Sequence, residues 1–246
     1  MWRYEGGRFR EEAFALPEEK RLLLVVNGKP WTAFSYTPGD EVYLALGHLF
    51  LSGVLRGLEG VRYLVGDGVV AVDLPEDPER GLGVRDSGCA AAGLRYGEPR
   101  LFPVPRVALD PGLPLHLLAE LRKRAARYAE TRGIHGAALF DPSGRLLYLS
   151  EDIGRHNAVD RLAGFMLLHG VTPPVLLAST GRVSQEMAAK AIGMGAALLA
   201  SRTGATAPAV ALARAYGLAL AAYVRPTGYR LYAPGGMPVA EGALKP

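Results

Sequence analysis

The segment of residues 151–161 concentrates side chains that can bind charge or move protons. It reads EDIGRHNAVDR and lies between two apolar segments. Asn157 is the predicted N-cap of a helix that begins at Ala158. A capped helix with a solvated entrance would explain Asn157 but leaves Arg155 and His156 unexplained. We therefore expect a binding or catalytic site here.

The side chains of this segment suggest different roles. We expect Glu151 and Asp152 to position Arg155 rather than to contact an anion themselves. His156 is a candidate proton donor or phosphate contact, with a structural histidine as the alternative. Asp160 falls in the first turn of the expected helix, where its charge suits the positive end of the helix dipole.

Arginines follow four predicted strands in the second half of the chain, close to the point where each strand ends. They are Arg155, Arg182, Arg202 and Arg225, which we call the strand-end rim. In an open α/β sheet the carboxyl ends of the strands form one edge, where ligands bind. Three helices are expected to begin there, and their free backbone N–H groups favour phosphate. The pattern predicts a phosphate or pyrophosphate site, although any one arginine alone suits a solvated surface.

Small polar residues accompany these arginines. Ser184 and Thr206 precede two expected helices, and N-capping is a sufficient explanation for them. The residues that we add to the candidate site are Thr180, Gly181, Ser201 and Thr203.

The elements that must position this site are expected within residues 113–246. A helix ending at Gly133 is followed by a hairpin that turns at residues 141–144. Strands are expected at residues 137–140 and 145–149 of this hairpin and then at residues 175–178, 197–200 and 218–224, with helices at residues 158–170, 185–194 and 208–216. This alternation predicts an α/β fold with a partly parallel sheet and helices on its faces.

Residues 1–74 are expected to form a smaller α+β domain. Hairpins are indicated across Asn27-Gly28 and across residues 66–68. Between them, Asp40 is expected to cap a helix that ends near Ser52. His48 lies on the apolar stretch of this helix and is expected to be structural.

A linker rich in glycine and proline, residues 75–112, carries Cys89. This is the only cysteine of the chain, so neither an intrachain disulfide nor a cysteine-based metal site is expected. A lone cysteine is usually a small buried hydrophobe. The neighbours of Cys89 are glycine, serine, charged residues and alanine, which favour a mobile and partly exposed thiol.

Composition narrows the class of protein. Hydrophobic residues make up 49% and charged residues 21% of the 246 residues, as in ordinary globular proteins. No charge-free apolar run reaches membrane length and the start has no signal-peptide core, so we expect a cytoplasmic protein without a membrane partner. The net charge of +4 fits an anionic partner but is too small to indicate nucleic acid.

Four ordered blocks of the sequence carry a resemblance to a known family. They are the segment EDIGRHNAVD, the segment STGRVSQEM with Lys190, the segment SRTGAT, and Tyr223-Val224-Arg225 through Tyr232. The first looks like the hallmark of the formate dehydrogenase accessory sulfurtransferases (FdhD family), and the others resemble the second, third and fourth blocks of that family. The resemblance runs from about Thr37 to Tyr232.

This resemblance implies a three-layer α/β/α domain of the cytidine-deaminase type, a homodimer, and the binding of a molybdenum cofactor as substrate. The substrate is molybdenum bis(molybdopterin guanine dinucleotide), whose nucleotide end a guanine nucleotide would mimic. Sulfur would pass as a cysteine persulfide from a cysteine desulfurase to this cofactor, before the cofactor enters formate dehydrogenase. The implied cofactor-binding segment comprises Tyr223, Val224, Arg225, Pro226, Thr227 and Gly228.

The persulfide loop of the family carries a Cys-x-x-Cys-Gly pattern that falls on residues 89–93. The first cysteine is Cys89, and the second position holds Ala92. This departure excludes a disulfide or a two-cysteine metal site within the loop and leaves persulfide chemistry on Cys89 alone. It also keeps open a second function, a non-catalytic carrier that binds and delivers the molybdenum cofactor.

A zinc-dependent deaminase is the competing enzyme class. That chemistry needs a His-x-Glu motif and a Pro-Cys-x-x-Cys motif to hold zinc and shuttle protons. The nearest match is His135-Gly136-Ala137, which lacks the glutamate, and no cysteine pair exists. We therefore expect neither deaminase activity nor a structural metal.

Overall fold

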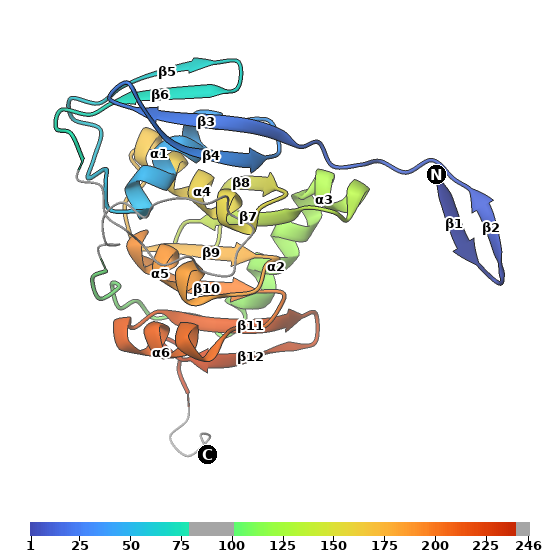
Figure 1. The fold of residues 1–246 in the computed structure, drawn as a ribbon. Coiled ribbons are helices and arrows are strands. Elements are labelled where there is room, and N and C mark those ends of the chain that lie inside the picture. The colour runs from blue at the N-terminus through green and yellow to red at the C-terminus, as the bar shows by residue number, and fades with distance from the viewer. Residues whose placement is uncertain (79–100, 240–246) are drawn as a thin grey trace.

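A six-stranded sheet forms the centre of the molecule in the computed structural model, which describes residues 1–78 and 101–239 (Figure 1). The strand order is β12-β11-β10-β9-β7-β8. Strands β9, β10 and β11 are parallel, whereas β7 runs antiparallel to both of its neighbours and β12 runs antiparallel to β11. The strands are β7 (His135–Phe140), β8 (Leu146–Asp152), β9 (Val175–Ser179), β10 (Ala196–Ser201), β11 (Ala219–Arg225) and β12 (Gly228–Ala233).

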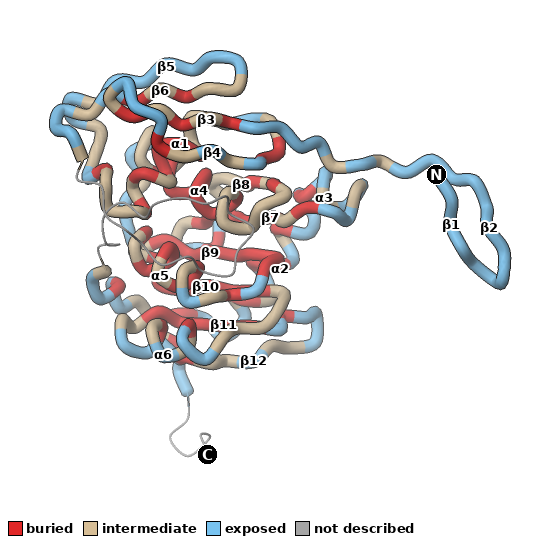
Figure 2. The backbone as a smooth tube through the Cα atoms, in the orientation of Figure 1, coloured by how far each residue is buried: buried red, intermediate tan, exposed pale blue. Residues whose placement is uncertain are grey.

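Helices cover both faces of this sheet. They are α2 (Leu113–Arg124), α3 (Ala126–Thr131), α4 (Arg155–His169), α5 (Gln185–Gly193) and α6 (Ala207–Tyr216). Alternate strand residues point to opposite faces, so Leu139 and Leu177 pack with α4, α5 and α6, while Phe140 and Leu176 pack with α2. Figure 2 shows the resulting buried strands between exposed outer surfaces. The expected α/β class and its three layers are confirmed.

A second sheet lies in the N-terminal part of the chain, with the strand order β4-β3-β6-β5. Both expected hairpins are present, and Asn27 and Gly28 have φ angles of 47° and 72°, as a tight hairpin turn requires. One face of this sheet packs on the helix that lies between β4 and β5 in the chain. The elements are β3 (Lys20–Val26), β4 (Lys29–Tyr36), α1 (Glu41–Leu51), β5 (Arg62–Gly66) and β6 (Val69–Asp73).

Two expectations about helix boundaries are wrong. Asp40 sits before α1 in a left-handed conformation, and its carboxylate accepts a hydrogen bond from the Tyr148 hydroxyl at 2.7 Å instead of capping the helix. The helix expected to run to Gly133 breaks at Ala125 and continues as α3. The break has a tertiary cause, because the Glu151 carboxylate accepts hydrogen bonds from the N–H groups of Arg127 and Tyr128 in the first turn of α3.

Two glycines join the N-terminal part to the central sheet. A Cβ atom placed on Gly47 of α1 would lie 1.7 Å from the Asp160 carbonyl oxygen of α4. A Cβ atom on Gly164 of α4 would lie 2.0 Å from the Tyr43 carbonyl oxygen of α1. The two helix backbones therefore touch, and side chains at these positions would force them apart.

We expect Gly47→Ala and Gly164→Ala each to lower the free energy of unfolding by about 1–3 kcal/mol, the usual effect of overpacking. The backbone atoms that the new methyl group meets cannot rotate away. Urea unfolding measures the loss. Gly57→Ala is the matched control, because nothing lies within 4 Å of its added Cβ. Equal stabilities for Gly47→Ala and Gly57→Ala would contradict the helix contact.

A hairpin at the N-terminus was not expected from the sequence. Strands β1 (Trp2–Glu5) and β2 (Arg8–Glu11) pair with each other and project away from the rest of the chain (Figure 1). None of the helices within residues 1–78 and 101–239 is long and apolar enough to cross a membrane.

Candidate strand-end phosphate site

The strand-end rim forms at one edge of the central sheet. Strands β8, β9, β10 and β11 all run in the same direction, so their carboxyl ends share that edge, where α4, α5 and α6 begin (Figure 1). Arg155, Arg182, Arg202 and Arg225 each follow or end one of these strands. The topology therefore places the four arginines at one edge of the sheet, as the alternation of elements predicts.

Hydrogen bonds fasten the loops after β9 and β10 to each other. The Ser201 hydroxyl donates to the Gly181 carbonyl oxygen at 2.8 Å, and the Arg202 N–H donates to the Ser179 carbonyl oxygen at 3.0 Å. The Thr203 N–H in turn donates to the Ser201 hydroxyl oxygen at 3.1 Å. Ser201 thus fixes the shape of the two loops through its hydrogen bonds to Gly181 and Thr203.

Thr180 has a similar structural task on the other side of the loop. Its hydroxyl oxygen accepts a hydrogen bond from the Gly136 N–H at 3.0 Å and lies 3.4 Å from Nδ1 of His135. His135 begins β7 and therefore lies at the same edge of the sheet. In the sequence it stands out only as the nearest match to a zinc-binding motif. Burial, together with the charge of Arg155, lowers the pKa of His135.

Arg155 lies across the glycine of the first loop. A Cβ atom on Gly181 would lie 2.9 Å from Cβ and 3.0 Å from Cδ of Arg155, so only glycine lets this side chain pass. Nε of Arg155 is buried, without a hydrogen-bond partner among the described residues. A buried guanidinium N–H without a partner is costly, and an anion held at this edge would satisfy it.

The segment from Tyr223 to Gly228 covers the end of β11 and the turn into β12. Tyr223 has a left-handed backbone, with φ of 53°, and its N–H donates to the Thr203 carbonyl oxygen at 3.0 Å. Its ring packs on Gly204, where an added Cβ would lie 2.6 Å from the phenolic oxygen. Tyr223 remains 42% exposed, and the Arg230 guanidinium lies 4.7 Å from the centroid of its ring.

Arg225 is tied to the protein more closely than the sequence suggested. Its Nη1 donates hydrogen bonds to the carbonyl oxygen of Arg202 and, at 2.9 Å, to the carbonyl oxygen of the preceding residue, Val224. Arg182 is exposed, and Arg202 is partly exposed. Pro226 and Thr227 are exposed in the turn. Arg225 therefore holds two loops together, whereas Arg182 presents its charge to solvent.

The expected N-cap of α4 is wrong. The helix begins at Arg155, with the extended residue Gly154 before it. Asn157 lies inside the first turn, and its amide donates to the Ser35 carbonyl oxygen at 2.8 Å and to Asp152 at 2.9 Å. Asn157 therefore links the N-terminal sheet to the end of β8, a contact across 122 residues that local pattern does not reveal.

The two carboxylates do not position Arg155 as expected. Asp152 is buried and forms an ion pair with Arg161 at 2.9 Å, and Arg161 also donates to the carbonyl oxygens of Glu151 and Thr37. Glu151 caps α3. Burial raises the pKa of Asp152, against the attraction of Arg161. The carboxylates of the motif thus hold neighbouring elements in place, and Arg155 stays free for the rim.

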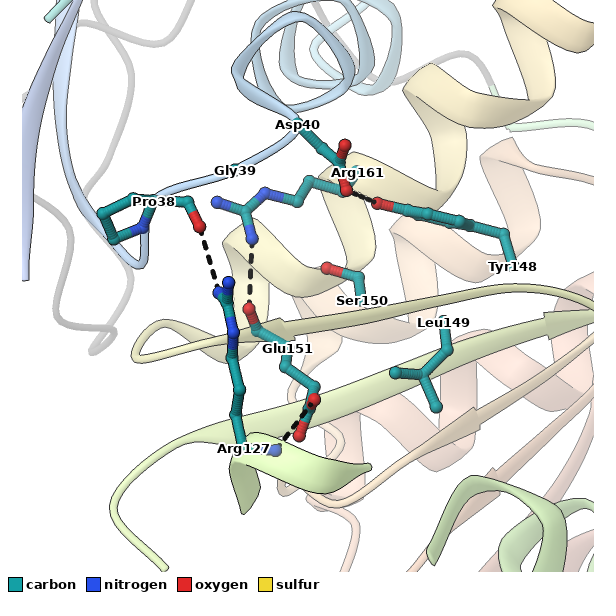
Figure 3. Close-up of a pocket in the computed structure, with 9 residues that line it drawn as sticks. All are labelled: Pro38, Gly39, Asp40, Arg127, Tyr148, Leu149, Ser150, Glu151 and Arg161. Carbon is teal, nitrogen blue, oxygen red and sulfur yellow. Dashed lines mark hydrogen bonds between the residues drawn. The ribbon is translucent and has the colours of Figure 1, made fainter. Parts of the chain in front are cut away.

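A cavity of about 130 Å³ opens beside this ion pair (Figure 3). Its polar groups largely bind one another: Arg127 donates to the Pro38 carbonyl oxygen at 3.0 Å, and the Tyr148 hydroxyl donates to Asp40 at 2.7 Å. Burial raises the pKa of Tyr148. No local sequence pattern indicates this cavity, because its lining residues come from distant segments: Pro38, Gly39, Asp40, Arg127, Tyr148, Leu149, Ser150, Glu151 and Arg161.

A chain of charged side chains runs inward from His156. Its Nε2 lies 3.6 Å from Glu186, Glu186 lies 3.5 Å from Nζ of Lys190, and Nζ lies 2.7 Å from Asp160. His48 of α1 lies 3.5 Å from the other oxygen of Asp160. Asp160 is therefore part of a helix-to-helix ion network, a stronger role than the expected interaction with the helix dipole.

We expect the free energy of unfolding to fall by about 2 kcal/mol between pH 7 and pH 5 through His156. Burial, followed by the charge of Lys190, lowers the pKa of His156 to about 4. The unfolded chain then takes up a proton below its pKa of about 6.5 while the folded chain does not, so stability decreases as pH falls through this window. Urea unfolding at both pH values checks this, and His156→Gln should flatten the dependence. A His156→Gln protein with the wild-type pH profile would place the titration elsewhere.

Cys89 and Ala92 lie outside the described residues. Within residues 1–78 and 101–239, no group of three or more histidine, cysteine, aspartate or glutamate side chains is arranged to hold a metal ion.

Comparison with known proteins places these features in a wider group. The model of the FdhD/NarQ family matches residues 17–236. The chain is 29% identical to the sulfur carrier protein FdhD of Bacillus subtilis, with 94% of this chain and 93% of that protein covered. It is 34% identical to the protein of the same name from Streptomyces coelicolor, with 94% and 91% covered.

A solved structure shares the fold. It is the crystal structure of a protein from Desulfotalea psychrophila, described as a formate dehydrogenase accessory protein. The superposition has a TM-score of 0.79 at 24% identity and covers 95% of this chain and 94% of that one.

Proposed function

Because the chain belongs to the FdhD/NarQ family, we propose that it is a sulfur carrier required for formate dehydrogenase activity. In this role it is a sulfurtransferase that takes sulfur from a cysteine desulfurase in the cytoplasm. The acceptor is molybdenum bis(molybdopterin guanine dinucleotide), bound here as substrate. We further propose that it works as a homodimer.

The proposed transfer has two balanced steps. The thiolate of Cys89 attacks the terminal sulfur of the desulfurase persulfide, the S–S bond of the donor breaks, and the donor cysteine leaves as a thiolate. Cys89 then carries the persulfide. In the second step its terminal sulfur bonds to molybdenum, the S–S bond breaks and Cys89 returns as a thiolate. The sulfur gains two electrons, which the metal supplies from its reduced form.

The strand-end rim supports the binding half of this proposal. The observation that carries it is the buried, unpartnered Nε of Arg155 above Gly181. A pyrophosphate oxygen would satisfy this donor, and Arg182, Arg202 and the N-termini of α5 and α6 would add positive potential. Thr180, Ser201 and Thr203 shape the loops, and the Tyr223–Gly228 segment would border the nucleotide. His156, whose depressed pKa keeps it neutral at pH 7, would offer a hydrogen bond rather than charge.

The decisive experiment is intact mass after incubation with a cysteine desulfurase and cysteine. A sulfurtransferase gains one sulfur that reductant removes, and Cys89→Ser gains none. The alternative function is a non-catalytic carrier of the molybdenum cofactor, which Ala92 in the second cysteine position favours. An unmodified chain that still binds guanine nucleotide would establish the carrier.

We expect Arg182→Ala to weaken binding of guanosine diphosphate by roughly 1.5–3 kcal/mol, the contribution of a charged hydrogen bond to phosphate. Arg182 is exposed, so its removal should not disturb the fold. Calorimetric titration gives the affinity. Arg145→Ala is the control, since this exposed arginine pairs with Asp141 in the β7–β8 turn at the opposite edge of the sheet. Unchanged affinity in Arg182→Ala would remove Arg182 from the site.

A further inference from the structure

The N-terminal arm, residues 1–16, ends in a hairpin that belongs to none of the features described for the site. Its strands pair with Trp2 opposite Glu11 and Tyr4 opposite Phe9. The arm lies outside the residues matched by the family model, which begin at residue 17. Figure 1 shows the hairpin directed away from the body, and Figure 2 shows it exposed along its length.

The hairpin is amphipathic although it lies in solvent. Trp2, Tyr4 and Phe9 share one face, are 65–67% exposed, and the rings of Tyr4 and Phe9 lie 5.1 Å apart. The opposite face carries only charged side chains: Arg3, Glu5, Arg8 and Arg10. One apolar face on an antiparallel pair is the pattern of a sheet that packs on another surface, and a two-stranded hairpin alone is at best marginally stable.

The base of the arm is anchored where it leaves the body. Cγ of Pro17 lies 2.7 Å from the position that a Cβ on Gly133 would occupy, so the proline fits against this glycine before β7. From this point the chain leads outward in Figure 1. Within the described parts of the chain, the apolar face of the hairpin is left uncovered.

A second apolar surface, the outer face of the four-stranded sheet, is not covered by any of the residues that the structure describes. Leu22, Leu24, Val70 and Val72 point inward and are buried in the core around α1. The residues between them point outward and remain partly exposed: Leu23, Val25, Val69 and Ala71. Leu64 of β5, opposite Ala71, is 78% exposed, and β5 is the edge strand of its sheet. An open, apolar edge of this kind usually has a partner.

Resting on the homodimer of the proposed function, we propose that the N-terminal arm of one copy packs its Trp2–Tyr4–Phe9 face on the outer sheet face around Leu64 of a second copy, which returns its own arm in the same way. Three rings of 150–250 Å², about two-thirds exposed, offer ~400 Å² per arm. Two exchanged arms and the surfaces under them then bury ~1,600 Å², the standard size of a stable interface.

Reciprocity distinguishes a second copy from other partners. A single arm on an unrelated protein would bury only ~800 Å², below the range of stable specific interfaces. The charged face of the hairpin holds three arginines and Glu5. Glu11 lies opposite Trp2 at the end of the aromatic face, and Glu12 follows it. The charge of the arm is therefore nearly balanced and does not favour an anionic membrane or nucleic acid.

The first test is sedimentation velocity of the full chain over a range of concentrations. We expect a dimer whose dissociation constant rises at least about tenfold in the triple variant Trp2→Ser, Tyr4→Ser, Phe9→Ser, because buried aromatic anchors dominate interfaces. The control, Arg3→Ser with Arg10→Ser on the charged face, should dimerise as the wild type does. A triple variant that dimerises as tightly as the wild type overturns the proposal. The same proteins are also mixed with phosphatidylcholine vesicles. A triple variant that loses vesicle binding but still dimerises as the wild type does would show that the arm contacts a membrane instead.

The second test locates the contact. Chains with Phe9→Cys are mixed with chains with Leu64→Cys, all carrying Cys89→Ser, and a short bismaleimide is added. We expect a product of twice the chain mass that needs both variants. Absence of this product rejects the sheet face as the docking surface. A further chain carries both Phe9→Cys and Leu64→Cys. If only this chain is cross-linked, and only within itself, the arm folds back on its own sheet.

Discussion

Cys89→Ala is expected to fold, to bind guanosine diphosphate with wild-type affinity and to leave formate dehydrogenase inactive. Cys89 is the only thiol of the chain, so nothing else can hold the transferred sulfur. The nucleophile of a covalent transfer has no substitute in an alanine side chain, and we expect a loss of at least about 100-fold. The measurement is formate dehydrogenase activity in a strain that lacks its own accessory protein.

Two comparisons make this result specific. Ala92→Cys should retain activity and add only the capacity for a disulfide with Cys89. Guanosine diphosphate titration of Cys89→Ala separates loss of sulfur chemistry from loss of cofactor binding. Full formate dehydrogenase activity with Cys89→Ala would make the thiol incidental and the protein a cofactor carrier.

Lys190→Met is expected to destabilise the protein by roughly 3–5 kcal/mol, a large part of the total stability of a typical domain. Nζ of Lys190 lies 2.7 Å from Asp160, and both side chains are almost completely buried. Burial by itself raises the pKa of Asp160, but Lys190 and His48 outweigh this effect and lower it, so the carboxylate is charged. Without Lys190 the charge would remain buried beside His48 alone.

Urea unfolding measures this loss, and a second variant tests its cause. Asp160→Asn combined with Lys190→Met removes both charges and should recover part of the lost stability. Lys29→Met is the matched control. Nζ of Lys29 lies 2.8 Å from the Asp77 carboxylate, a similar distance, but both of these side chains are exposed. A loss below about 1 kcal/mol is expected there. Similar losses for Lys190→Met and Lys29→Met would contradict a special role for the buried network.

Most of the secondary structure of residues 113–239 was predictable because each element carries its own local signal. Ser184 and Thr206 cap α5 and α6 as expected, each accepting a hydrogen bond from an N–H three residues later. Gly170 and Gly217 end α4 and α6 in left-handed conformations. Caps and glycine stops act within one helical turn, so the sequence contains the whole of their physical cause.

The convergence of the arginines was also predictable, since strand direction follows from the order of strands and helices. The partners of individual side chains were not. Asp152 accepts a hydrogen bond from the Thr37 N–H, 115 residues away, and Arg161 binds the same segment. A carboxylate next to two arginines in sequence gives no local sign of which it will pair with.

By itself, the sequence determined the α/β class, the edge of the sheet where four arginines meet and the single thiol, because periodicity, strand order and composition are properties of the chain alone. Only the tertiary structure decided that Asp152 serves Arg161, that Lys190 neutralises Asp160 and that Gly47 and Gly164 let two helices touch. These outcomes depend on which segments become neighbours. Burial then selects, among several possible partners, the one that leaves no charge or backbone group unsatisfied.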